Sequence, residues 1–184
     1  LINYIAVHLS YSLWESVMAV HMTNMGIPFY AYSMLWTLNG VLIIIGQPLV
    51  NKLSPYVRLS TQIIVGIFIF ALSFLLLIFA WTLTAFVIDF VILTIGEMTS
   101  FAGLPAWIAQ LTNVDEAGHY QGLLNIMMSV GRAIGPLYGG FVIEKGSYQF
   151  LFISVFCLIT GTLIIICLYL WYLYRVQRRL NLDK

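Results

Sequence analysis

Six long apolar stretches dominate this sequence, and short breaks rich in turn-forming residues separate them. A helix that crosses the hydrocarbon core of a bilayer needs about 20 predominantly apolar residues. Only 8% of the residues are charged, against about 25% in soluble domains, so the chain cannot cover itself with a surface suited to water. The sequence therefore predicts an all-α membrane protein of one six-helix bundle within residues 1–174. The six expected spans cover residues 4–24, 32–53, 60–80, 84–108, 119–143 and 149–174.

The basic residues predict the orientation of these spans. Lys52 and Arg58 flank the second break, and residues 175–184 form a basic tail. If six helices cross alternately, six of the seven cations outside the bilayer lie on one side, and Lys145 alone lies on the other. Lys and Arg accumulate in cytoplasmic loops. We therefore expect a multi-pass protein of the plasma membrane, with both ends of this segment and the tail in the cytoplasm.

A glycine stripe marks the span 119–143. Gly131, Gly135 and Gly139 recur every four residues, so on a helix they form one smooth face that another backbone can approach closely. Pro136 removes a helix donor within the stripe and predicts a bend. Arg132 adds a permanent charge in the same turn. Close packing, a bend and a buried ion are what a moving part of a membrane protein requires.

A similar interruption occurs in the span 32–53, which contains Gly40, Gly46 and Pro48. The two interrupted spans are the middle helices of two sets of three. Matching glycine-proline interruptions in corresponding spans point to inverted repeats in secondary transporters. We therefore expect two inverted three-helix repeats. Coincidence is the alternative, because Gly and Pro are frequent in membrane helices.

Three charges fall near the middle of their spans: Glu15, Glu97 and Arg132. A charge at that depth costs several kcal/mol unless it is paired, hydrated or neutralised. Glu97 and Arg132 would lie at similar depth on neighbouring spans, so we expect them to pair. In the functional interpretation Glu97 binds a proton and Arg132 switches its proton affinity. In the alternative, the two form a static pair that orders two helices.

Other polar residues are weaker candidates for a substrate or proton pathway. His8, Ser12 and Glu15 share one helix face, which is either a cavity lining, as we expect for Glu15, or a polar seam between helices, as we expect for His8. Asp89 lies nearer the outer end of its span, where we expect water to reach it. Asn39 is a cavity-lining candidate, although a hydrogen bond between helices is the more common role of such a residue.

Several classes of function find no support in the sequence. The net charge is +1 and no basic run lies outside the tail, which argues against a nucleic-acid partner. Cys157 and Cys167 share one predicted helix, and no cluster of residues resembles a metal or cofactor site. No arrangement of catalytic side chains appears at one depth, so we do not expect an enzyme.

Three segments carry a resemblance to a known family: G-R-A-I-G-P-L-Y-G-G at 131–140, G-E-M-T-S-F-A-G-L-P at 96–105 followed by G-H-Y-Q-G at 118–122, and G-Q-P-L-V-N-K-L at 46–53. Together they resemble the C-terminal half of a major facilitator superfamily transporter of the drug:proton antiporter type. The first is similar to that family's glycine-proline antiporter motif, here with Gly131, Gly135, Pro136, Gly139 and Gly140. The last resembles a degenerate cytoplasmic loop motif, with Gly46, Pro48 and Lys52.

The resemblance implies a function and a missing partner. Proton-coupled efflux of small amphipathic compounds would proceed by alternating access between this half and an N-terminal six-helix half, driven by a proton gradient. The chain starts within an apolar run and without Met, which fits a piece of a longer protein. The alternatives are a carrier of the same fold for sugars, peptides or siderophores, and a truncated membrane fragment without transport. Where the family has an arginine and an acidic residue in its loops, this chain has Ala117 and Asn51.

Overall fold

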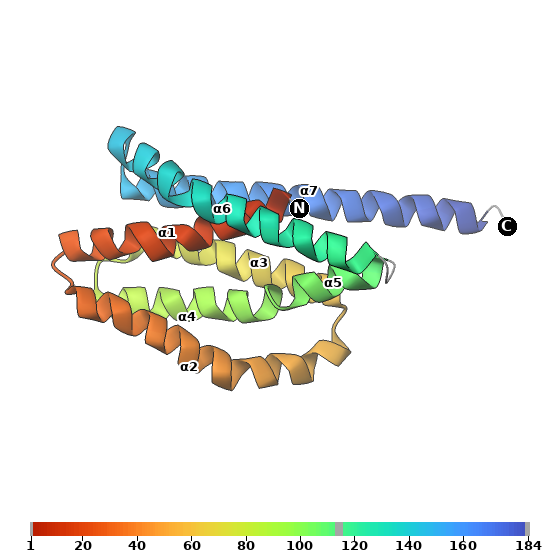
Figure 1. The fold of residues 1–184 in the computed structure, drawn as a ribbon, viewed down its shortest axis with the longest axis horizontal. Coiled ribbons are helices and arrows are strands. Elements are labelled where there is room, and N and C mark those ends of the chain that lie inside the picture. Colours follow the sequence, from red (N-terminus) through yellow and green to blue (C-terminus); the bar gives the residue numbers. More distant parts are fainter. Residues whose placement is uncertain (1, 113–115, 183–184) are drawn as a thin grey trace.

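The computed structural model describes residues 2–112 and 116–182, which form helices joined by short connections (Figure 1). Two 3-10 turns, η1 (Ser54–Tyr56) and η2 (Leu77–Phe79), extend the ends of α2 and α3. The α-helices are α1 (Ile2–Asn24), α2 (Phe29–Leu53), α3 (Leu59–Leu76), α4 (Leu83–Ser100), α5 (Gly103–Leu111), α6 (Ala117–Lys145) and α7 (Tyr148–Leu182).

Five helical segments are long and apolar enough to cross a membrane. α1 has 23 residues but is more polar than these five. The all-α, multi-pass class expected from the sequence is confirmed for the described residues, and the sixth crossing and the inverted repeats stay predictions. The five segments are Phe29–Tyr56, Leu59–Phe79, Leu83–Gln110, Ala117–Lys145 and Tyr148–Tyr172.

The span expected over residues 84–108 is not one uninterrupted helix. α4 ends at Ser100 and α5 begins at Gly103, with a turn between them. Pro105 explains the interruption, because it has no N–H and its ring crowds the carbonyl of Phe101, four residues earlier. In the first turn of α5 the missing donor costs nothing, since that N–H would have no partner within the helix.

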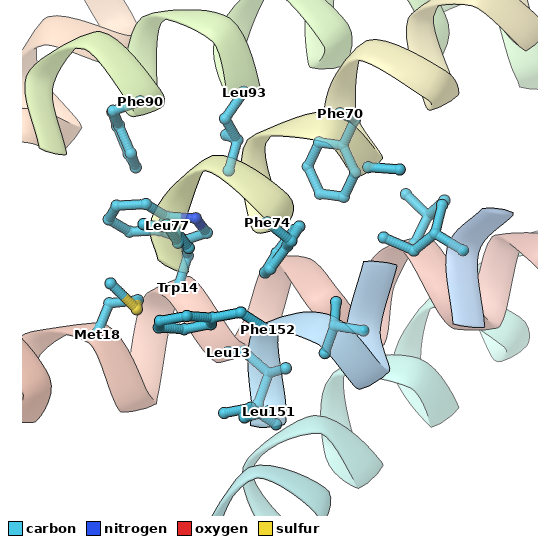
Figure 2. Packing of buried hydrophobic residues seen from close by; sticks show 14 of the residues in the cluster. Leu13, Trp14, Met18, Phe70, Phe74, Leu77, Phe90, Leu93, Leu151 and Phe152 are labelled. Atoms are coloured by element: carbon cyan, nitrogen blue, oxygen red, sulfur yellow. The ribbon is translucent and has the colours of Figure 1, made fainter. Parts of the chain in front are cut away.

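The apolar core lies between α1, α3, α4 and α7. Figure 2 shows aromatic and aliphatic side chains from these helices meeting around Trp14 and Phe74, both of them almost fully buried. The rings of Trp14 and Phe90 pack edge to face, with centroids 4.6 Å apart. α2 contributes few buried residues and lies along one edge of the bundle in Figure 1. One face of α2 is therefore left open.

The glycine stripe of α6 packs directly against α1. A Cβ atom on Gly131 would lie 2.6 Å from the Ile5 carbonyl oxygen, and one on Gly139 would lie 2.5 Å from a methyl group of Leu13. A Cβ on Gly135 would overlap the Ser12 hydroxyl. The close helix approach predicted from the stripe is therefore confirmed, and α6 continues through Pro136 without interruption.

α7 is longer than the predicted span 149–174. It runs for 35 residues, or about 52 Å, which exceeds the ~30 Å hydrocarbon core. In Figure 1 its C-terminal end projects beyond the other helices. The part of the tail up to Leu182 is thus helical, and Lys184 lies outside the described residues.

Candidate functional site

A polar cluster joins the middle of α2 to the C-terminal part of α4. The side-chain amide of Asn39 donates hydrogen bonds to the Thr94 hydroxyl at 3.0 Å and to the Glu97 carboxylate at 2.8 Å. Asn39 and Thr94 are buried, while Glu97 is partly exposed. The hydrogen bond between helices expected of Asn39 is confirmed. A partly exposed carboxylate that a neighbouring helix holds is a candidate for taking up and releasing a proton.

Tyr11 of α1 brings a third helix to this cluster. Its hydroxyl lies within electrostatic range of the Glu97 carboxylate. Its ring packs on Trp36 and Phe101, with centroids 5.7 and 5.8 Å away. The Glu97 carboxylate thus lies where α1, α2 and α4 converge, with Asn39 as its hydrogen-bond donor and Tyr11 nearby.

The partner expected for Arg132 was wrong. Arg132 forms an ion pair with Glu15 rather than with Glu97. The reason is the packing of α6, which lies along α1 through its glycine stripe and not along α4. The side chains of Arg132 and Glu15 are 45% and 35% exposed, so this pair lies on an open face of the described chain.

His8 and Ser12 lie in the seam between α1 and α6. A Cβ atom on Gly131 would approach the His8 Cβ to 3.0 Å, and the Ser12 hydroxyl donates to the Leu9 carbonyl within its own helix. The His8 ring is buried and packs edge to face on Tyr4, with centroids 4.4 Å apart. The polar-seam interpretation therefore holds for these two residues, whereas Glu15, on the same helix, reaches the open face.

Asp89 does not lie in a hydrated outer region as expected. Its side chain is 2% exposed, and neither carboxylate oxygen has a hydrogen-bond partner among the described residues. The helical repeat explains the difference, because Asp89 lies on the same face of α4 as Gly96, and that face packs against α3. Asp89 is thus separated from the Glu97 cluster.

The remaining motif residues have different surroundings. Gly46 faces a side chain of α4, since a Cβ there would lie 2.7 Å from the Met98 sulfur. Pro48 and Lys52 are exposed near the end of α2. Pro136 is also exposed, and a Cβ on Gly140 would meet no atom within 4 Å. Neither Pro136 nor Gly140 takes part in the close contact with α1.

Sequence reasoning missed two members of the cluster, Tyr11 and Thr94. The spacing of both carried a signal. Tyr11 precedes Glu15 by four residues and Thr94 precedes Glu97 by three, so each shares a helix face with a carboxylate in the middle of an expected span. Hydroxyl groups one turn from an intramembrane acid are natural partners for it.

Comparison with known proteins places the chain in a family. Residues 1–183 match the Major Facilitator Superfamily. The chain is 37% identical over 159 residues to the uncharacterized MFS-type transporter YttB of Bacillus subtilis (strain 168). The aligned residues make up 85% of this chain and 40% of that relative. It is also 33% identical over 106 residues to vacuolar basic amino acid transporter 1 of Saccharomyces cerevisiae. These aligned residues make up 58% of this chain and 19% of that relative. This chain therefore spans about two fifths or less of the relatives' length. It is a multi-pass membrane protein that belongs to the major facilitator superfamily.

Proposed function

We propose that the complete protein is a secondary active transporter that exports small amphipathic compounds in exchange for protons. In this proposal the described chain is one six-helix wall of a central cavity, and a second six-helix half forms the other wall. Alternating access would come from rocking of the two halves. The observation that carries the proposal is the Glu97 cluster, a partly exposed carboxylate held within membrane-spanning helices by Asn39. Intramembrane acids commonly mark proton or substrate pathways.

α1 serves as the sixth span in this proposal. Its 23 residues reach about 34 Å, enough to cross the ~30 Å hydrocarbon core. Asn3, His8, Ser10 and Ser12 are shielded because much of the helix is buried against α6 and α7, and Glu15 is paired with Arg132. The low hydropathy of α1 is therefore compatible with a crossing position inside the bundle, with both ends of the chain on the cytoplasmic side of the plasma membrane.

The pattern of helix neighbours supports two inverted repeats. If α1, α2 and α3 correspond to α4, α6 and α7, the contact of α1 with α6 should reappear as a contact of α4 with α2. The contact of α3 with α4 should reappear as one of α7 with α1. All four contacts occur. These four contacts are what a pseudo-twofold axis relating the two sets would produce.

Protonation of Glu97 would act on the joint between α2 and α4. A hydrogen bond to an ionised carboxylate is roughly twice as strong as one between neutral groups. Proton uptake would therefore weaken the hydrogen bond from Asn39 and loosen the attachment of α2 to α4. Few residues of α2 are buried, so little else holds this helix. Glu15 and Arg132 form a second, exposed joint between α1 and α6, which the glycine stripe allows to slide.

The remaining candidate residues take supporting roles in the proposal. Gly131, Gly135, Pro136, Gly139 and Gly140 form the antiporter-like motif of the sliding helix. Gly46, Pro48 and Lys52 form the cytoplasmic loop motif. Asp89, buried against α3, is a secondary proton site at most in this scheme.

The proposal is tested with the full-length protein in proteoliposomes that carry a pH gradient and a trapped pH-sensitive dye. Ethidium serves as the amphipathic probe. We expect ethidium to accumulate against its gradient while protons move the opposite way, and a protonophore to abolish the accumulation. Equilibration of ethidium that ignores the pH gradient would contradict proton exchange and favour a uniporter.

A second candidate substrate class is basic amino acids. The yeast relative is named a basic amino acid transporter, and the Glu97 carboxylate is the kind of group that binds a cation. Arginine in the same proteoliposomes distinguishes the two candidates. Competition by arginine for ethidium transport, together with arginine accumulation, favours this second candidate.

A further inference from the structure

Two cavities adjoin each other where α2 passes through η1 into α3. The first has a volume of about 220 Å³ and is lined mainly by apolar groups of α2 and α3, with Thr99 of α4. The second is more polar and is bordered by Asn51, Ser54 and Gln110. Val57 lines both, so the first is the apolar part and the second the polar part of two neighbouring cavities. The apolar part includes Val50, Leu53 and Val65.

The apolar part contains one buried polar atom without a partner. The Gln62 side chain donates from its nitrogen to the Thr99 carbonyl at 3.2 Å. Its amide oxygen is buried and accepts no hydrogen bond from the described residues. An unpaired buried acceptor destabilises this wall of the cavity.

Two cations are next in sequence to residues of the polar part. Lys52 follows Asn51, and Arg58 lies between Val57 and Leu59. Both side chains are exposed, and neither forms an ion pair with an acidic residue among those described. Tyr56, between them, is 87% exposed, as aromatic residues at the level of lipid headgroups often are. The polar part therefore lies where headgroups meet the ends of the spans.

We propose that this site binds one phospholipid with an anionic headgroup. A stretch of acyl chain fills the apolar part, and the phosphate lies near Lys52 and Arg58. The apolar part, at about 220 Å³, is smaller than the pockets of about 300–1,000 Å³ that enclose a whole drug-sized molecule. Its volume therefore fits a stretch of one acyl chain. The site lies at the end of α2, away from the Glu97 cluster, and the proposal does not depend on the direction or substrate of transport.

The test is lipid titration of the full-length protein in detergent, followed by native mass spectrometry. Phosphatidylglycerol and phosphatidylcholine with identical chains are compared. We expect one phosphatidylglycerol to bind more tightly than phosphatidylcholine. Each cation should contribute about fivefold to the affinity, so Lys52→Ala combined with Arg58→Ala should reduce it by about 25-fold, toward the value for phosphatidylcholine. Lys145→Ala is the matched control, because this exposed cation lies over the Phe141 ring, far from the site in sequence, and should leave the affinity unchanged.

A second pair of variants tests the acyl-chain part. Val65→Trp fills the apolar cavity from its half-exposed wall and should prevent binding of either lipid. Phe68→Trp changes an exposed residue of the same helix outside the cavity and should have no effect. Glycerol phosphate, a headgroup without chains, should not displace the lipid. Three results would overturn the proposal: equal binding of the two phospholipids, unchanged binding in both Val65→Trp and the double variant, or displacement by glycerol phosphate.

Discussion

The side-chain amide of Asn39 holds the Glu97 carboxylate at 2.8 Å and thereby joins α2 to α4. The same amide donates to the Thr94 hydroxyl, so one residue of α2 is hydrogen-bonded to two residues of α4. Few other polar contacts hold α2 to the bundle among the described residues, apart from Tyr32, whose hydroxyl donates to α1 carbonyls. The Asn39 joint is therefore a point at which protonation and helix movement can be coupled.

Removing this joint should cost stability. Asn39→Ala leaves the Glu97 carboxylate and the Thr94 hydroxyl without their donor, and we expect the free energy of unfolding to fall by about 0.5–2 kcal/mol. Thermal unfolding in detergent measures the change. In Glu97→Gln the charged partner is already gone, so Asn39→Ala should cost less in that background. Equal costs in both backgrounds would show that the two residues are not coupled.

The glycine stripe offers a matched pair of substitutions on one helix. Gly135→Ala places a methyl group into the Ser12 hydroxyl and within 2.6 Å of the Leu9 carbonyl oxygen, so α1 and α6 must separate. We expect a loss of about 1–3 kcal/mol. Gly140→Ala meets no atom within 4 Å and should have little effect or stabilise α6 slightly. A similar Tm for the two variants would contradict the close packing of α1 on α6.

The ion pair between Glu15 and Arg132 can be tested by exchanging the two charges and comparing the Tm of the single and double variants. Glu15→Arg or Arg132→Glu alone places like charges together, whereas the double exchange restores an attraction. Because both side chains are partly exposed, the pair itself is worth only about 0–1 kcal/mol. We expect each single variant to lower Tm and the double variant to recover most of the loss. Additive losses in the double variant would mean that the two groups do not interact.

Asp89 should tolerate a neutral replacement. An ionised carboxylate buried without a partner costs several kcal/mol, and Asp89→Asn removes that possibility while keeping the shape. We expect Tm to stay the same or rise, and transport by the full-length protein to continue. Asp89→Leu, which changes the shape, is the comparison. A marked loss of transport in Asp89→Asn with normal stability would instead make Asp89 part of the proton pathway.

Helix positions were largely predictable because span length and turn residues are local properties of the sequence. The contact of the Gly131–Gly139 stripe with another helix was also predictable, since three glycines at a spacing of four leave a smooth face. The interruption at Phe101 and Ala102 follows from Pro105. A proline disrupts a helix at the residue four positions before it, so this interruption was also predictable.

The pairing of the charges was not predictable from depth alone. Glu97 and Glu15 both lie at a level that Arg132 can reach, and the choice between them depends on which helix α6 packs against. The burial of Asp89 likewise depends on the rotation of α4, which the Gly96 contact with α3 sets. Both are tertiary properties, and neither hydropathy nor span length reports them.

The most direct test of proton exchange is the effect of Glu97→Gln on transport by the full-length protein in proteoliposomes. Glu144→Gln, at the exposed end of α6, is the matched control. We predict that Glu97→Gln loses accumulation of ethidium driven by a pH gradient, by at least about tenfold, while Glu144→Gln keeps it. Undiminished proton-driven transport by Glu97→Gln, at the same protein level and Tm, would contradict the account.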